Sequence, residues 1–193
     1  MKRKQPRLGV DLGGVVIDKY AIDPKTGVRY PRQHPDIPEV KDAFDALFTL
    51  NTLGVQIYTV SSGGLEVERG RKTWLARHKF FERTHVPAWN LRFCEERKNK
   101  LIWCKHLGIT HFVDDRAEVL SALASDVPYL YLFRPRPRLN GEGEAHGPEP
   151  FMERSETWHE LTRLLIRDIE AYQLKLGRVA ERLTGLDEAD EEP

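Results

Sequence analysis

The sequence predicts an α/β fold in which helices cover both faces of a parallel sheet. Short apolar runs of strand length alternate along the chain with segments whose apolar residues recur at helical spacing, and this alternation is typical of parallel sheets. The first apolar run, residues 8–11, ends in Asp11, and the run at 110–113 leads directly into Asp114 and Asp115. Because ligands of such sheets bind at the carboxyl ends of the strands, these carboxylates mark the edge where a functional site is expected.

Residues 19–38 break this alternation after the first strand. The segment is rich in proline, and Thr26 and Gly27 form a turn signal between two short β-leaning pieces. We therefore expect a loop or small hairpin, a small flap that projects over the edge of the sheet.

The remaining elements follow from the same two periodicities. The expected helices span 40–53, 65–78, 99–107 and 117–124, and the expected strands span 55–60, 91–94, 110–113 and 129–133. Residues 155–183 are expected to form one or two helices. The part up to 166 should cover the sheet, and the remainder either extends that packing or forms a contact in a homodimer.

Length and composition favour a single domain. With 193 residues, 40% of them hydrophobic, the chain is long enough for one domain with a sizeable core. We expect this domain to span 1–193, with a core at about 8–165, a C-terminal helical extension at about 166–185 and an acidic tail at 186–193.

The charge balance gives no general attraction to nucleic acid or membrane. Lys plus Arg and Asp plus Glu number 30 each, so either partner would have to use a local patch. The only cysteines, Cys94 and Cys104, are too few for a disulfide framework, and neither a signal sequence nor a long apolar segment is present. We therefore expect a cytoplasmic protein without a membrane partner.

The carboxylates at the sheet edge predict a magnesium site. Crowded carboxylates repel one another unless a hard cation or a proton lies between them, and carboxylate and carbonyl oxygens suit Mg²⁺. Magnesium usually also binds substrate phosphate, which leaves another carboxylate free as a nucleophile for phosphoryl transfer. The structural alternative is that Asp11 caps a turn before Gly13 and that Asp114 and Asp115 cap the helix near 117.

A serine- and glycine-rich turn is a candidate phosphate seat. Ser61, Ser62 and Gly63 follow the strand expected at 55–60, and hydroxyl and backbone N–H groups in such a turn before a helix bind phosphate oxygens. Alternatively, a serine here is a helix N-cap.

Two further basic segments are candidates for binding charge. Lys98 and Lys100 stand at the start of a helix, where the helix dipole disfavours a cation, so a lysine there is expected to offset carboxylate or phosphate charge unless it is merely solvated. Arg134 and Arg136 leave the strand at 129–133 in a proline-rich loop. Proline fixes an extended backbone, so these arginines are either presented to substrate or part of a solvated loop.

Taken in order, these segments resemble the haloacid dehalogenase-like (HAD) hydrolase superfamily. Polar residues at strand ends, or at the start of a helix, carry the resemblance: Asp11, Ser61, Lys100, Asp114 and Asp115. It covers about residues 8–165 and rests on order and spacing more than on any single motif. The resemblance implies a Rossmann-like core.

The resemblance also implies a role for each residue. Asp11 would be the nucleophile that forms an aspartyl-phosphate, while Ser61 and Lys100 would hold the phosphoryl oxygens. Mg²⁺ would be bound by Asp11, the backbone carbonyl of Gly13 and Asp115, with Asp114 in support.

One departure from the family pattern concerns proton transfer. Most family phosphatases carry a second Asp two residues after the nucleophile, and this chain has Gly13 there, in a DxGGV variant of the motif. Glycine has no proton to give, and general acid–base help typically contributes about 100- to 10,000-fold. Turnover should be slow unless Asp18, His34 or a metal-bound water supplies the proton.

A second departure concerns the lid. Neither 18–55 nor 62–98 has room for the large cap domain of many relatives, so we expect an open site that admits a bulky substrate. The sequence thus predicts a magnesium-dependent phosphatase (phosphoric monoester hydrolase) acting on a nucleotide, a nucleic-acid end or another bulky phosphorylated substrate. The alternative is a HAD-fold binding or regulatory module that has lost catalysis.

Overall fold

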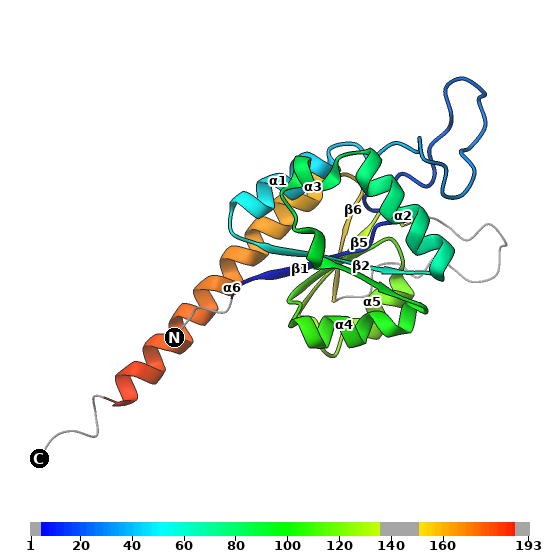
Figure 1. Ribbon diagram of the computed structural model, residues 1–193. Coiled ribbons are helices and arrows are strands. Elements are labelled where there is room, and N and C mark those ends of the chain that lie inside the picture. The colour runs from blue at the N-terminus through cyan, green and yellow to red at the C-terminus, as the bar shows by residue number, and fades with distance from the viewer. Residues whose placement is uncertain (1–4, 136–150, 188–193) are drawn as a thin grey trace, which may run out of the picture.

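Six parallel strands form the sheet at the centre of the molecule (Figure 1). The computed structural model describes residues 5–135 and 151–187, with side chains described as far as residue 177. The strands are β1 (Arg7–Val10), β2 (Gln56–Ser62), β3 (Leu91–Cys94), β4 (His111–Asp114), β5 (Tyr129–Phe133) and β6 (Met152–Ser155). They lie in the order β3-β2-β1-β4-β5-β6, and every neighbouring pair is parallel. The predicted α/β fold is confirmed.

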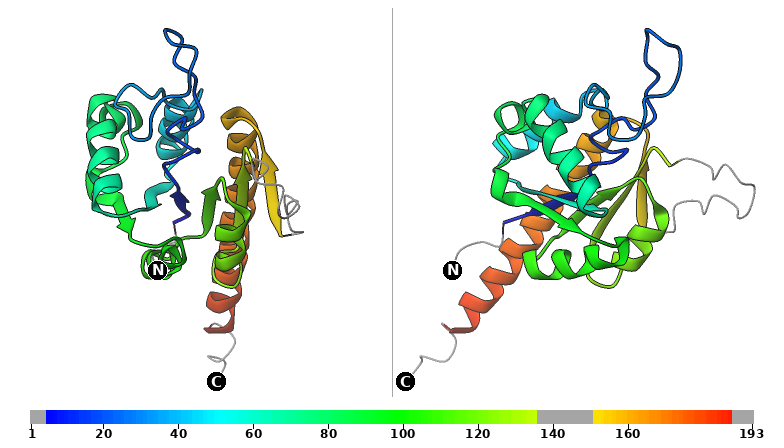
Figure 2. Two further views of the ribbon diagram at one scale, coloured as in Figure 1. Left: turned by 90° about the vertical axis from the view of Figure 1, so that its right-hand side faces the viewer. Right: turned by 45° about the vertical axis from the view of Figure 1, so that its right-hand side comes forward.

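Helices lie on both faces of this sheet, as predicted. They are α1 (Ala43–Thr52), α2 (Leu65–Arg77), α3 (Phe80–Thr84), α4 (Lys100–Leu107), α5 (Ala117–Leu123) and α6 (Trp158–Asp187), with short 3-10 turns η1 (Ala88–Asn90) and η2 (Arg97–Asn99). One face carries α1, α2, α3 and α6, and the other carries α4 and α5 (Figure 1). Figure 2 shows that the later turns of α6 run on past the sheet.

The strands bury side chains on both faces. Successive side chains of a strand point to opposite sides, so in β4 Phe112 packs with α4 and α5, while Val113 packs with the helices of the other face. In β5, Leu132 packs on the face of α4 and α5, and Tyr131 packs on the opposite face. All four side chains are fully buried. Burying a side chain of this size contributes roughly 1.5–3 kcal/mol. The sheet is therefore the core of the fold.

The C-terminal region corrects one prediction. Residues 152–155 form the edge strand β6, and the helix expected from 155 begins at Trp158 and continues as a single helix. The strand escaped prediction because its two central side chains, Glu153 and Arg154, are exposed. An edge strand with one solvated face shows no apolar run.

Several element boundaries also differ from the expected ones. The helix expected from residue 40 begins only at Ala43, because the Val40 N–H donates to the carbonyl of Val16 and Asp42 has a left-handed backbone (φ 65°). Strand β2 continues through Ser62, so the serines lie within the strand end. The helix α3 and the 3-10 turns were not predicted, since such short pieces show no periodic pattern.

The flap is confirmed as an irregular projection between β1 and α1 (Figure 1). A hairpin at its tip pairs Ile22 with Arg29, and the indole N–H of Trp74 donates to the carbonyl of Ile37 at 2.7 Å, which ties the base of the flap to α2. The intervals from β1 to β2 and from β2 to β3 are both fully described, and neither holds a separate cap domain.

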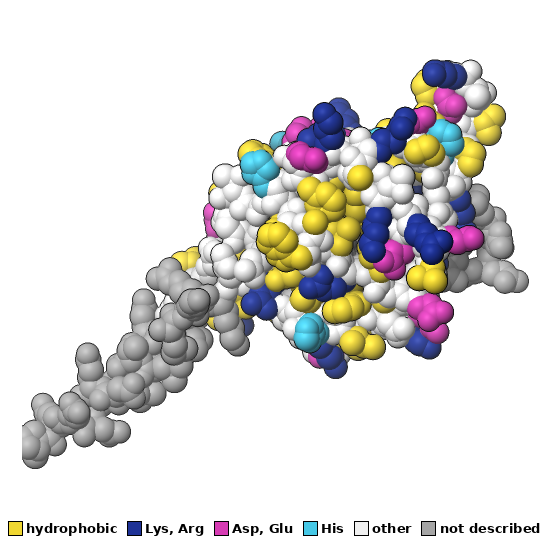
Figure 3. All heavy atoms as spheres, viewed as in Figure 1, with side chains coloured by type: hydrophobic (Ala, Val, Ile, Leu, Met, Phe, Trp, Pro, Cys, Tyr) yellow, Lys and Arg dark blue, Asp and Glu magenta, His cyan; other side chains and the backbone are white. Residues whose placement is uncertain are grey.

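The surface is mixed in charge. On the face shown in Figure 3, basic and acidic side chains are interspersed among apolar ones, in keeping with their equal numbers in the sequence. Among the described helices, none combines the length and apolar character needed to cross a lipid bilayer.

Candidate active site

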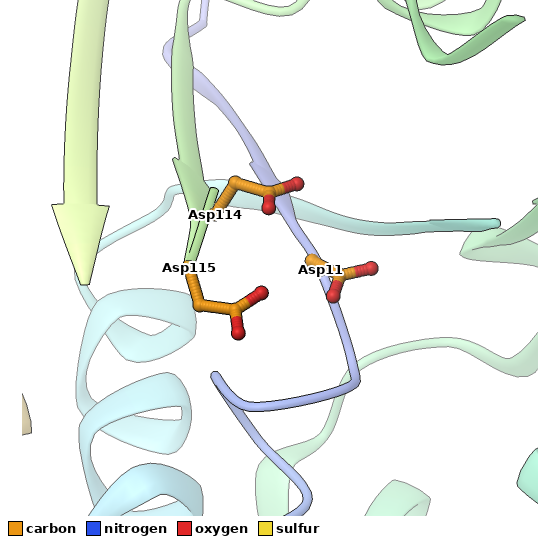
Figure 4. A group of neighbouring side chains, drawn as sticks. All are labelled: Asp11, Asp114 and Asp115. Atoms are coloured by element: carbon orange, nitrogen blue, oxygen red, sulfur yellow. The ribbon is translucent and has the colours of Figure 1, made fainter. Parts of the chain in front are cut away.

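Three carboxylates converge at the carboxyl edge of the sheet. Asp11 directly follows β1, Asp114 ends β4, and Asp115 comes next. Since β1 and β4 are paired neighbours, with Val10 level with Val113, these side chains emerge side by side. One oxygen from each lies within 4.8 Å of the others (Figure 4). The chain leaves β1 and β4 toward opposite edges of the sheet, and such a switch point is where ligands of α/β sheets bind.

Lys100 is the cation that holds two of these carboxylates together. Its Nζ lies 2.9 Å from Asp11 Oδ1 and 2.6 Å from Asp114 Oδ2, and its side chain is almost fully buried. Lys98 instead lies on the surface and pairs with Glu96 at 2.7 Å. The structure therefore decides which of the two lysines reaches the site.

The charges of this cluster depend on one another. Burial opposes ionisation of Asp11, but the ammonium of Lys100 and the guanidinium of Arg71 lower its pKa to about 2. Burial lowers the pKa of Lys100, but the carboxylates of Asp11 and Asp114 outweigh this and raise it above its usual value. Burial, with the two neighbouring carboxylates, raises the pKa of Asp114. Asp11 is thus an ionised carboxylate beside a charged ammonium.

Ser61 and Arg71 extend this network behind Asp11. The Ser61 hydroxyl, fully buried, donates to Asp11 Oδ1 at 3.0 Å. It is not the N-cap of α2, which is Gly64. The guanidinium of Arg71 donates to Ser61 Oγ and, at 2.9 Å, to the carbonyl of Ser62.

Arg71 was not predicted as a site residue. It lies on the same face of α2 as Val67 and Trp74, which line the same cavity. Their spacing of three and four residues is the one signal in the sequence that could have placed Arg71 there.

A second lysine, Lys19, was also not predicted. Its Nζ lies 2.6 Å from Asp115 Oδ2 and 2.9 Å from the carbonyl oxygen of Gly13. The Tyr20 hydroxyl donates to the same Asp115 oxygen at 3.2 Å. Both residues open the flap, where no local pattern points toward the sheet edge.

The two glycines after Asp11 differ in what they tolerate. Gly14 has φ +94°, and a Cβ there would meet Asp115 Oδ2 at 2.6 Å, so this position requires glycine. Gly13 is not among the glycines with a left-handed backbone. A Cβ at Gly13 would lie 2.9 Å from Arg71 Nη2, the far end of a flexible side chain.

A cavity of about 1060 Å³ opens in front of these residues. The wall is formed by Asp11, Lys100, the flap, one face of α2 and the segment 95–98, together with Ser62 and Gly63. That Ser62 and Gly63 bind substrate stays a prediction. This volume suits a small-molecule ligand.

The arginines expected to bind substrate lie elsewhere or outside the described residues. Arg134 donates to Asp18 Oδ2 at 3.3 Å, and neither residue is part of the cavity wall. Arg136 lies outside the described residues. His34 does line the cavity, and its Nδ1 accepts a hydrogen bond from the backbone N–H of Asp36 at 3.2 Å.

The oxygen donors at this edge fit a hard cation. Asp115 Oδ1 is buried and accepts no hydrogen bond from the described residues, with Arg116 Nε 4.0 Å away. Both oxygens of Asp114 are engaged, by Lys100 and by the backbone N–H of Arg116. Asp115 therefore fits direct metal binding better than Asp114, which holds Lys100.

Comparisons with known proteins place the fold. Neither protein-family models nor curated protein sequences give a match. Among solved structures, the chain is similar to D,D-heptose 1,7-bisphosphate phosphatase from B. bronchiseptica, complexed with magnesium and phosphate (TM-score 0.60, 13% identity, 85% of this chain and 99% of that chain). It is also similar to a haloacid dehalogenase-like family hydrolase from Xanthomonas campestris (TM-score 0.56, 10% identity, 89% and 98%). A third similar structure is a dehalogenase with an intermediate complex (TM-score 0.56, 12% identity, 85% and 98%).

At these identities the likeness is one of fold. The three structures include a phosphatase and a dehalogenase, so the chemistry of this chain has to be argued from its own side chains.

Proposed function

Because the chain has the HAD-like fold, we propose that it is a magnesium-dependent phosphatase that forms an aspartyl-phosphate on Asp11. The observation that carries this proposal is the state of Asp11. Its carboxylate is ionised, its Oδ1 accepts hydrogen bonds from Ser61 and Lys100, and it lies on the wall of the cavity. A carboxylate held in this way is an oriented nucleophile.

The free oxygen of Asp11 would perform the attack. Asp11 Oδ2 forms a bond to phosphorus while the bond from phosphorus to the leaving oxygen breaks, and that oxygen keeps the electron pair. Water then attacks the aspartyl-phosphate, which releases inorganic phosphate and restores the Asp11 carboxylate.

Several residues would hold the phosphoryl group during these steps. Lys100 and the Ser62 hydroxyl are the expected ligands of its oxygens, and Ser61 keeps Asp11 in place. The backbone N–H of Gly63 already donates to the carbonyl of Cys94 at 2.9 Å, so Gly63 serves as part of the cavity wall. Asp11, the Gly13 carbonyl and Asp115 are the expected ligands of Mg²⁺. When bound, magnesium supplies positive charge to the phosphoryl oxygens.

Hydrolysis of p-nitrophenyl phosphate with magnesium tests this function. We expect wild type to release nitrophenol and Asp11→Asn to lose that activity. A matched control is Asp126→Asn, which removes an exposed carboxylate paired with Lys105. Activity that survives Asp11→Asn would contradict the proposal.

The second candidate is a binding or regulatory module without catalysis. It is favoured by Gly13, which provides no acid, and by Arg71, which is well placed to hold an anion. Binding of inorganic phosphate, with no hydrolysis across nucleotides, sugar phosphates and phosphopeptides, would support it. Three predictions from the sequence stay predictions. They are a nucleotide or nucleic-acid end as the substrate, a homodimer through α6, and a cytoplasmic location.

A further inference from the structure

The guanidinium of Arg71 stands where a side chain at position 13 would begin. A Cβ built on Gly13 would lie 2.9 Å from Arg71 Nη2 and 3.8 Å from Asp11 Oδ2. Hydrogen bonds to Ser61 Oγ and the carbonyl of Ser62 hold the guanidinium there. A positive charge therefore occupies the space beside Asp11 that a side chain at position 13 would enter.

The groups that contact Asp11 are poor proton donors. Lys100 is held as an ammonium by two carboxylates, the Ser61 hydroxyl already donates to Asp11, and a guanidinium stays charged. Asp114 is 0% exposed, and both its oxygens already accept hydrogen bonds, from Lys100 and from the backbone N–H of Arg116. None of these described groups is therefore expected to protonate the oxygen that leaves phosphorus.

The cavity in turn suits an anionic leaving group. Basic side chains outnumber acidic ones on its wall, and the basic set includes Arg32, Arg71 and Arg97. Lys19 and Arg116 also line it but are paired with Asp115 and Glu118. Two of the acidic residues, Asp11 and Asp114, are already paired with Lys100. Guanidinium groups stabilise carboxylate or phosphate anions through charge-assisted hydrogen bonds.

From these observations we propose that the site acts on anhydrides of phosphoric acid, in which the phosphoryl group is joined to the oxygen of a second acid. Acyl phosphates and nucleoside diphosphates belong to this class. Their leaving group is a carboxylate or phosphate anion, which is stable without a proton and binds to arginine. The proposal rests on the phosphatase function above and names its substrate class.

The step balances without an acid. Asp11 Oδ2 bonds to phosphorus, and the anhydride oxygen leaves with the bonding electron pair as an acid anion near Arg71. In the second step the oxygen of water bonds to phosphorus, the Asp11 carboxylate leaves, and the protons of the water remain on the phosphate product. Asp11 is itself a good leaving group, so neither step needs a proton donor.

Acetyl phosphate and ethyl phosphate form a matched pair for the test. They have nearly the same size and differ in whether the leaving group is acetate or ethoxide. We expect kcat/KM for acetyl phosphate to exceed that for ethyl phosphate by at least about 10,000-fold, the upper range of what general acid help contributes. Nitrophenyl phosphate should likewise be hydrolysed much faster than phenyl phosphate. The rate with Asp11→Asn is the background to subtract.

Substitutions at positions 71 and 13 test whether the specificity comes from the Arg71 guanidinium and from the missing acid at Gly13. Arg71→Ala should lower kcat/KM for acetyl phosphate and weaken binding of inorganic phosphate in calorimetry, and Arg71→Lys should restore part of both. In the Arg71→Ala background, Gly13→Asp should raise hydrolysis of ethyl phosphate more than that of acetyl phosphate. Gly13→Asn in the same background is the control for size.

The outcomes separate the two proposals. Asp11-dependent hydrolysis of acetyl and ethyl phosphate at similar rates would uphold the phosphatase and overturn the anhydride specificity. If that similarity disappears in His34→Ala, the proton comes from His34 on the cavity wall. No hydrolysis of either acetyl or nitrophenyl phosphate would overturn both proposals.

Discussion

The ammonium of Lys19 lies 2.6 Å from Asp115 Oδ2 and so places a positive charge at the proposed metal site. The same Nζ lies 2.9 Å from the carbonyl oxygen of Gly13, a second expected ligand of Mg²⁺. An ion bound by these two oxygens would compete with the Lys19 ammonium for them.

Lys19→Met should therefore tighten magnesium binding. The variant removes a competing cation while keeping most of the side-chain length, and we expect Kd to fall on the order of tenfold. Calorimetric titration with Mg²⁺ measures the effect, and Lys25→Met, at an exposed flap lysine, is the control. Unchanged or weaker binding in Lys19→Met would show that Lys19 does not compete with the ion.

Magnesium should also stabilise the folded protein through Asp115. A ligand that binds only the folded state adds RT ln(1 + [L]/Kd), which is about 2.7 kcal/mol at a hundred times Kd. The Tm measured with millimolar Mg²⁺ should rise in wild type and in Asp126→Ala, but not in Asp115→Ala. The same rise in Asp115→Ala would remove this residue from the metal site.

Lys100→Met should destabilise the protein and abolish its activity. The variant leaves Asp11 and Asp114 buried without their partner, and breaking a buried ion pair costs on the order of 3–5 kcal/mol. Urea unfolding gives the loss directly. Lys98→Met is the matched control, because this exposed lysine pairs with Glu96 at the surface, and the unfolding midpoint of the variant should not move. Equal effects at the two positions would contradict the assignment.

His111 should make the fold sensitive to mild acid. Burial lowers its pKa to about 4, well below the usual 6.5, and its ring stacks on Tyr129 at 4.5 Å. Between these two values the unfolded chain binds the extra proton and the folded protein does not, so stability is complete above pH 6.5 and falls toward pH 4, by up to about 3 kcal/mol. His111→Phe keeps the stacking and should flatten this part of the stability–pH curve measured by urea unfolding, whereas the exposed His106→Phe should not. A wild-type curve that is flat from pH 6.5 to 4 would contradict the assignment.

Much of the site's location could be predicted from the sequence. Asp11, Ser61 and Asp114 each lie at or next to the carboxyl end of a strand whose apolar run is plain in the sequence. All carboxyl ends of a parallel sheet share one edge. Local pattern and that one geometric rule were enough to bring these residues together.

The tertiary structure alone decided which basic side chains contact the polar residues at the sheet edge. Lys19 and Arg71 reach Asp115 and Ser61 only because the flap folds back and α2 packs with a particular rotation. The choice of Lys100 over Lys98 depends in the same way on which side of a helix faces inward. Periodicity predicts that an amphipathic segment is a helix, but the contacts of its polar side chains depend on distant parts of the chain. A strand end is specified by its own residues, whereas a charge pair is specified by the packing that joins two segments.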